Sequence, residues 1–95
     1  MVLIQYVGFE AKVSLREYSY RILDPLAGER VIVFTISNQA FLAKLVRYQD
    51  APEICYLKLQ KELEAETTEH PLRRRSVVSE EELGEYRATH RPAKR

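Results

Sequence analysis

The hydrophobic residues of this chain follow two different periods, and their density falls sharply after residue 66. Up to that point apolar side chains recur first in a pattern typical of strands and then in one typical of helices, whereas residues 67–95 are polar and highly charged. A segment with so few apolar side chains cannot offset the entropy cost of ordering its backbone. We therefore predict a compact domain over residues 1–66 and a disordered tail over residues 67–95 that folding does not require.

The beginning of the chain has the two-residue period of β-strands. Residues 1–7 form a short apolar run that is too short to span a membrane, and we interpret it as a strand. Over residues 9–15 apolar and polar side chains alternate, as in a strand with one buried and one solvated face. Alternation resumes over residues 18–22 on the other parity, so we expect a turn or bulge near Arg16 and Glu17.

A hairpin is predicted next. Residues 24–28 contain Pro25, which restricts φ, and Gly28, which adopts positive φ readily. The following run, residues 30–36, is apolar without alternation, which indicates a central strand that is buried on both faces.

Two helices are predicted after the strands. Ser37 and Asn38 are both suitable N-caps for a helix that ends near Gln49, and apolar side chains recur every three or four positions in this segment. Asp50 and Glu53 have the spacing of a capping box at the start of a second helix over residues 51–66. The elements in this order predict an α+β fold, with a small antiparallel sheet of three to four strands followed by two helices and a polar C-terminal tail.

The tail contains one candidate helix. Residues 79–87 begin with Ser79 and Glu82 at capping-box spacing and carry Leu83 and Tyr86 on one face. In isolation this helix would be only marginally stable, because it is shorter than the roughly 12–15 residues that an isolated helix needs.

The central part of the chain resembles a known family. The sequence FTIS at residues 34–37, at the end of a strand, and AFL at residues 40–42, at the start of a helix, resemble the small bacterial family called domain of unknown function 1488. The resemblance covers residues 18–66. It implies the fold alone, because that family has no established activity or site residues.

The predicted domain contains no motif for catalysis, metal binding or nucleotide binding. His70 and His90 both lie in the tail, so no serine or cysteine of the domain has a histidine of the domain as a general base. Cys55 lies on an apolar helical stripe, where we expect a buried structural thiol. A lone cysteine forms no internal disulfide, which favours the reducing cytoplasm. We predict a cytoplasmic protein that is not an enzyme and has no cofactor or metal.

One face of the sheet is a candidate interface. An even number of loop residues in the hairpin would bring four side chains together on that face: Tyr18, Tyr20, Val31 and Val33. Two helices can cover only one face of a small sheet, so the other face would be left apolar and exposed. We predict that it joins two copies of the chain in a homodimer or binds an unknown protein partner, and that the protein is an interaction or adaptor module of unknown pathway.

The alternative function is a nucleic-acid-associated accessory protein. Arg73, Arg74 and Arg75 form a basic cluster in the tail that would neutralise phosphates. The tail also contains several glutamates, and the formal net charge of the whole chain is only +1. Protein interaction is therefore the preferred function.

Overall fold

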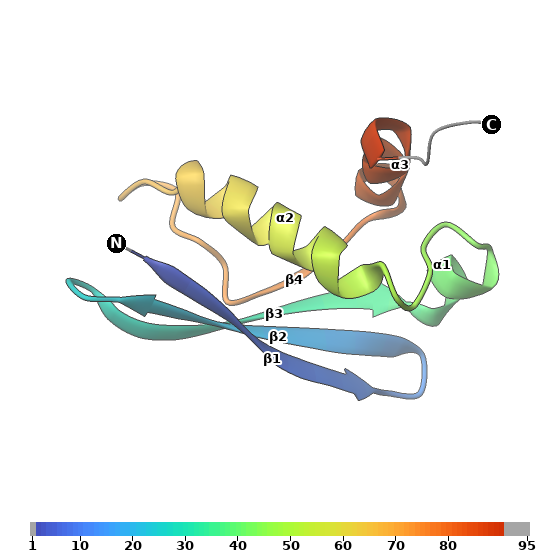
Figure 1. The fold of residues 1–95 in the computed structure, drawn as a ribbon, viewed down its shortest axis with the longest axis horizontal. Coiled ribbons are helices and arrows are strands. Elements are labelled where there is room, and N and C mark those ends of the chain that lie inside the picture. Colours follow the sequence, from blue (N-terminus) through green and yellow to red (C-terminus); the bar gives the residue numbers. More distant parts are fainter. Residues whose placement is uncertain (1, 91–95) are drawn as a thin grey trace.

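The computed structural model describes residues 2–90 of the chain and the side chains of residues 2–88. Its elements are β1 (Leu3–Ala11), β2 (Leu15–Asp24), β3 (Gly28–Ser37), α1 (Asn38–Leu42), α2 (Ala51–Glu64), β4 (Arg75–Val77) and α3 (Glu80–His90). The strands form one sheet in the order β1-β2-β3-β4, and α2 and α3 lie on the same side of it (Figure 1). The predicted α+β fold class is confirmed.

The sheet is mixed, which differs from the purely antiparallel sheet that we predicted. The first three strands pair antiparallel through short turns, whereas β4 pairs parallel to β3. A parallel neighbour needs a long crossover connection. Here α1, α2 and the segment after α2 provide that connection between β3 and β4.

The first turn lies earlier than the alternation suggested. β1 ends at Ala11 and β2 begins at Leu15, and the turn between them is closed by the Lys12 amide, which donates to the Leu15 carbonyl at 2.8 Å. The prediction of one strand over residues 9–15 is therefore wrong, and so is the turn near Arg16 and Glu17. Val13 continued the apolar alternation in the sequence, yet it is fully exposed at the tip of the turn.

The β2–β3 hairpin is confirmed, but its loop has an odd number of residues. Asp24 pairs with Gly28, which leaves three residues in the loop. The Asp24 carboxylate accepts a hydrogen bond from the Leu26 amide at 2.9 Å, and Gly28 has a φ of 93°, a conformation that favours glycine. This amide and the Ala27 amide hold the pKa of Asp24 below its ordinary value.

The odd loop exchanges the faces that we predicted for β3. Tyr18 lies opposite Phe34 and Tyr20 lies opposite Ile32, so these four side chains share one face of the sheet. The prediction that the two tyrosines share a face with Val31 and Val33 is wrong.

The core lies between this face of the sheet and the helices. Tyr18 and Tyr20 are each only 1% exposed, and the Tyr20 hydroxyl donates a hydrogen bond to the Pro52 carbonyl at the start of α2. The helices and the segments next to them contribute further buried residues: Ala40, Phe41, Val46, Ala51, Ile54, Cys55, Leu59, Val78 and Leu83.

The first helix is much shorter than predicted. The Ser37 hydroxyl caps it, as expected, by accepting from the Ala40 amide at 3.2 Å, but α1 ends at Leu42. The Lys44 amide donates to the Phe41 carbonyl at 3.0 Å and the Leu45 amide donates to the Ala40 carbonyl at 2.9 Å. These two bonds form a Schellman motif, in which the left-handed position is usually a glycine. Here it is Lys44, with a φ of 62°.

The second helix agrees with the prediction over nearly its whole length. α2 spans Ala51–Glu64, with Pro52 in its first turn. The capping box is wrong, however, because the Asp50 side chain makes no cap hydrogen bond. Its carboxylate is held instead by Arg47, with Nε at 2.8 Å from Oδ2.

The structure differs most from the predicted disordered tail. β4 and α3 both lie in that segment, and Val78 and Leu83 are 3% and 0% exposed. The candidate helix is confirmed together with its capping box: the Ser79 amide donates to the Glu82 carboxylate at 2.9 Å, and the Glu82 amide donates to the Ser79 hydroxyl at 3.1 Å. The compact unit thus continues beyond Glu66 and through α3, while residues 91–95 of the predicted tail lie outside the described residues.

Candidate interaction surface

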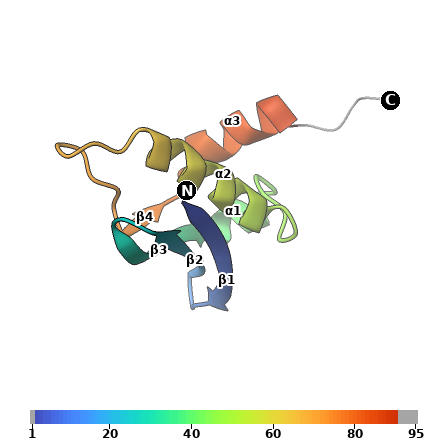
Figure 2. The same cartoon turned by 60° about the vertical axis from the view of Figure 1, so that its left-hand side comes forward.

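The outer edge of the sheet is formed by β1, a long strand of nine residues. Among the described residues β1 pairs only with β2, so its outward-facing amide and carbonyl groups have no strand beside them (Figure 2). Four large apolar side chains of this strand are 43–57% exposed: Leu3, Tyr6, Val7 and Phe9. An edge strand that is both long and apolar is prone to pair with another strand.

The aromatic residues of β1 are fixed although they are half-exposed. Tyr6 contacts Tyr20 with ring centroids 5.2 Å apart, and Phe9 stacks on Tyr18 at 5.8 Å. A β-bulge lies between Tyr6 and Gly8, where the glycine has a φ of 145°. Because contacts within the chain already restrict these rings, little side-chain entropy would be lost if a partner covered them.

A cation further restricts Phe9. The guanidinium of Arg16 lies 4.6 Å from the centre of the Phe9 ring and 4.1 Å from that of Tyr48. Tyr48 in turn stacks on Phe41, with centroids 4.4 Å apart. Cation–π contacts of this kind stabilise by about 0.5–2 kcal/mol. They connect the end of β1 to the segment between α1 and α2.

The face of the sheet opposite the core is covered by no described helix. Its apolar residues include Val31 and Val33, two of the four predicted interface residues, while Tyr18 and Tyr20 are buried on the other face. The structure therefore does not bring these four together. Ion pairs cross the open face: Arg21 lies 3.0 Å from Glu29. Antiparallel sheets often have one face of this mixed, solvated kind.

The predicted phosphate-binding arginines lie before and within β4. Arg73, Arg74 and Arg75 are all exposed, but Arg75 forms an ion pair with Glu17 across the open face. The backbone of Arg74 accepts a hydrogen bond from the Val33 amide at 2.7 Å. One of the three charges is thus neutralised within the chain, and the backbone of this cluster is engaged in extending the sheet.

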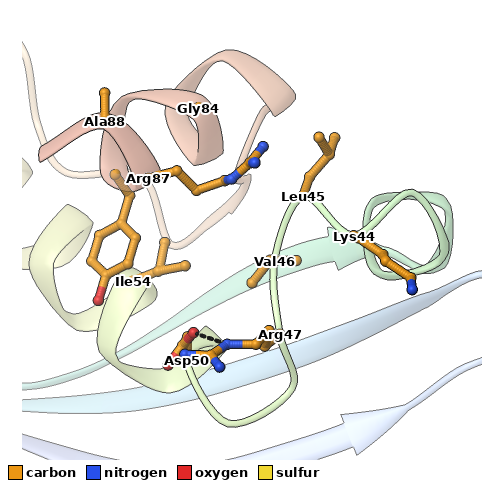
Figure 3. Close-up of a pocket in the computed structure, with 10 residues that line it drawn as sticks. Lys44, Leu45, Val46, Arg47, Asp50, Ile54, Gly84, Arg87 and Ala88 are labelled. Atoms are coloured by element: carbon orange, nitrogen blue, oxygen red, sulfur yellow. Dashed lines mark hydrogen bonds and ion pairs between the residues drawn. The ribbon is translucent and has the colours of Figure 1, made fainter. Parts of the chain in front are cut away.

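A groove lies between α3 and the segment that leads into α2. Its volume is about 610 Å³, and its lining includes three cations, Lys44, Arg47 and Arg87, and one carboxylate, Asp50 (Figure 3). Sequence reasoning missed this site, because its charged residues come from two segments that lie far apart along the chain. No spacing in the sequence indicates that they meet.

The titratable side chains that lie in the core include Cys55 and Tyr20. Cys55 is fully buried, and burial raises the pKa of its thiol to about 12, so the thiol is protonated at neutral pH. Burial also raises the pKa of Tyr20. Among the described side chains, those of residues 2–88, no group of three or more His, Cys, Asp or Glu is arranged to hold a metal ion. None of the described helices has the length and hydropathy needed to cross a membrane.

No family model matches the chain, and comparison with curated proteins and with solved structures finds no significant match. The resemblance to domain of unknown function 1488 therefore stays a prediction.

Proposed function

We propose that this protein is a non-enzymatic protein-interaction module of the cytoplasm that works as a homodimer, joined edge to edge through β1. The observation that supports this proposal is the free edge of β1, with its four half-exposed apolar side chains. A strand from a second copy would satisfy the outward amide and carbonyl groups and cover those side chains at the same time.

The edge is a better interface than the open face because their polar groups differ. On the open face Arg21 pairs with Glu29 and Arg75 pairs with Glu17, so the charges are satisfied within one chain. Covering them would remove paired charges from water, which is costly. Among the described residues no second strand bonds to the outward groups of β1, and a strand from another copy would offer such bonds together with apolar contact.

The partner best suited to this edge is a second copy of the same strand. Closed twofold pairing is the commonest way in which identical chains associate. Antiparallel pairing centred near Tyr6 would place the apolar start of one strand opposite the apolar Phe9 region of the other. The Glu10 carboxylates of the two copies would lie at opposite ends of the interface, and each is already paired with Lys12 of its own chain at 3.1 Å.

Light scattering of the purified full chain at micromolar concentration tests the proposal. The expected mass is twice that of one chain. Val7→Lys should give a monomer with an unchanged circular dichroism spectrum, because a lysine on an edge strand disfavours pairing. Val31→Lys, a matched change on the open face, should remain a dimer.

Two results would reject the β1 interface. One is a monomeric mass for the unsubstituted chain. The other is a dimer that Val31→Lys dissociates and Val7→Lys does not, which would assign the interface to the open face.

A further inference from the structure

The groove between α3 and residues 44–54 has an apolar base. Val46 and Ile54 line it and are almost completely buried, and Leu45 beside them is half-buried. On the side of α3 the lining residues include Gly84 and Ala88, one helical turn apart, and a Cβ atom added at Gly84 would meet no atom within 4 Å. The α3 wall is therefore open enough for another chain to approach the helix backbone closely.

The charge of the groove is positive once its internal pairs are counted. Asp50 is bound to Arg47, and the charge of the nearby Glu53 carboxylate offsets only one of the two remaining lining cations. Lys44 and Arg87, on opposite walls, have no ion-pair partner among the described residues. Figure 3 shows the Arg87 side chain extending from α3 toward the facing segment.

Two lining residues are unfavourable choices for the stability of the fold. Gly84 lies inside a helix, where glycine makes the helix less stable than alanine would, although the space around it would accept a larger side chain. Lys44 holds the left-handed position of a Schellman motif, where glycine is preferred. Sites that bind a ligand commonly retain residues that reduce stability in this way.

We infer that this groove binds an acidic peptide segment in an extended conformation. Alternate apolar side chains of the segment would lie on Val46 and Ile54, and its carboxylates would reach Lys44 and Arg87. The apolar base favours a peptide over a bare phosphate, because a peptide supplies apolar and anionic groups in alternation. The site is separate from β1, and the inference does not depend on dimerisation.

Nuclear magnetic resonance titration of the ¹⁵N-labelled full chain tests this inference. The probe is the acetylated tetrapeptide Leu-Glu-Leu-Glu, and Leu-Lys-Leu-Lys is its control. The acidic probe should shift amide signals of residues 44–47, 54 and 84–88, and added salt should weaken the response. Arg87→Glu should lower the affinity about tenfold, since a charged contact is lost. Arg73→Glu, which changes a cation outside the groove, should leave it unchanged.

Two further variants separate binding from folding. Gly84→Ala and Lys44→Gly should each raise Tm, because they relieve the two unfavourable backbone choices, and each should weaken binding of the acidic probe. The inference is overturned if the acidic probe causes no shifts at millimolar concentration, if the basic probe causes the same shifts, or if the shifts fall outside the groove. It is also overturned if Gly84→Ala and Lys44→Gly both leave the affinity unchanged, or if a short oligonucleotide shifts the same signals more strongly.

Discussion

The two edges of the sheet are built in opposite ways. β4 forms one edge with only three residues, and its first residue, Arg75, is charged and paired with Glu17. β1 forms the other edge with nine residues, most of whose large apolar side chains are half-exposed. Short and charged edge strands resist pairing with other chains, whereas long apolar ones promote it. The comparison indicates that the chain protects one edge and keeps the other available.

The edges also depend on different parts of the sequence. β1 is held by a local hairpin with β2. β4 comes from a distant segment, which is attached through the bond from the Val33 amide to Arg74 and the bond from the Val78 amide to the Thr35 carbonyl, at 2.7 and 2.9 Å. The β4 edge should therefore be lost with α3, whereas the half-exposed Val7 side chain of the β1 edge should add little to the stability of the single chain.

The largest effect is expected when the β4 edge is removed. A chain ending at Glu66 loses the buried Val78 and Leu83 and uncovers the outer edge of β3. Each deletion of a large core side chain costs about 2–5 kcal/mol, and the total stability of a small domain is about 5–15 kcal/mol. We expect the cooperative thermal transition to disappear, and we expect a control chain ending at His90 to keep it. A truncated chain that unfolds cooperatively within about 1 kcal/mol of the full chain would contradict this dependence.

A single core substitution in α3 should have the next largest effect. Leu83→Ala should lower the free energy of unfolding by about 2–5 kcal/mol, because Leu83 is fully buried. Glu81→Ala, on an exposed position of the same helix, should change it by less than about 0.5 kcal/mol. Urea denaturation measures both values, and equal small effects would show that α3 does not hold the β4 edge in place.

A smaller and pH-dependent effect is expected at the link between α3 and α2. Burial alone would raise the pKa of Glu82, but hydrogen bonds from Lys58 and from Ser79 outweigh it and hold this pKa below its ordinary value. A carboxyl whose pKa is lower in the folded state stabilises the fold above its unfolded pKa, and this stabilisation is lost as the pH falls through the folded pKa.

Glu82→Gln should therefore lower stability by about 1 kcal/mol at neutral pH, a value reduced for partial exposure of the side chain. The difference from the unsubstituted chain should begin to shrink near pH 4.3, about the unfolded pKa of a glutamate, and vanish once the pH lies below the lower folded pKa. Urea denaturation at several pH values measures this, with Glu81→Gln as the control. A difference that grows at acid pH would contradict a folded-state pKa of Glu82 below its ordinary value.

The smallest effect on stability is expected at the β1 edge. In the dissociated single chain Val7→Lys should change the free energy of unfolding by less than about 0.5 kcal/mol, because the Val7 side chain is half-exposed. Denaturation at a concentration low enough to keep both forms monomeric measures this value. A loss of more than about 1 kcal/mol would show that Val7 supports the core of the single chain, and that Val7→Lys does not report on the interface alone.

The sequence predicted local structure well where a residue type restricts the backbone. Pro25 and Gly28 located the hairpin, and Ser37 and Ser79 located helix starts. It failed at α1, because the left-handed residue that ends this helix is Lys44 and not a glycine.

Features that depend on long-range contacts were not predictable in the same way. Which side chains of β3 point toward the core depends on whether the hairpin loop has an odd or even number of residues. No turn residue in the sequence specifies that number. Val78 and Leu83 pack into a core to which mainly other segments contribute, so the low average apolar content of residues 67–95 was misleading. The groove combines Lys44 with Arg87, and only the packing of α3 beside the segment before α2 brings them together.

Contacts between copies would show whether two chains pair through β1. In a sample that mixes ¹³C-labelled with unlabelled chains, isotope-filtered nuclear Overhauser effects report only contacts between different copies. We expect such contacts along β1, with Tyr6 of one copy near Tyr6 of the other. Contacts that join Val31 or Val77 of the two copies, or no contacts between copies, would contradict it.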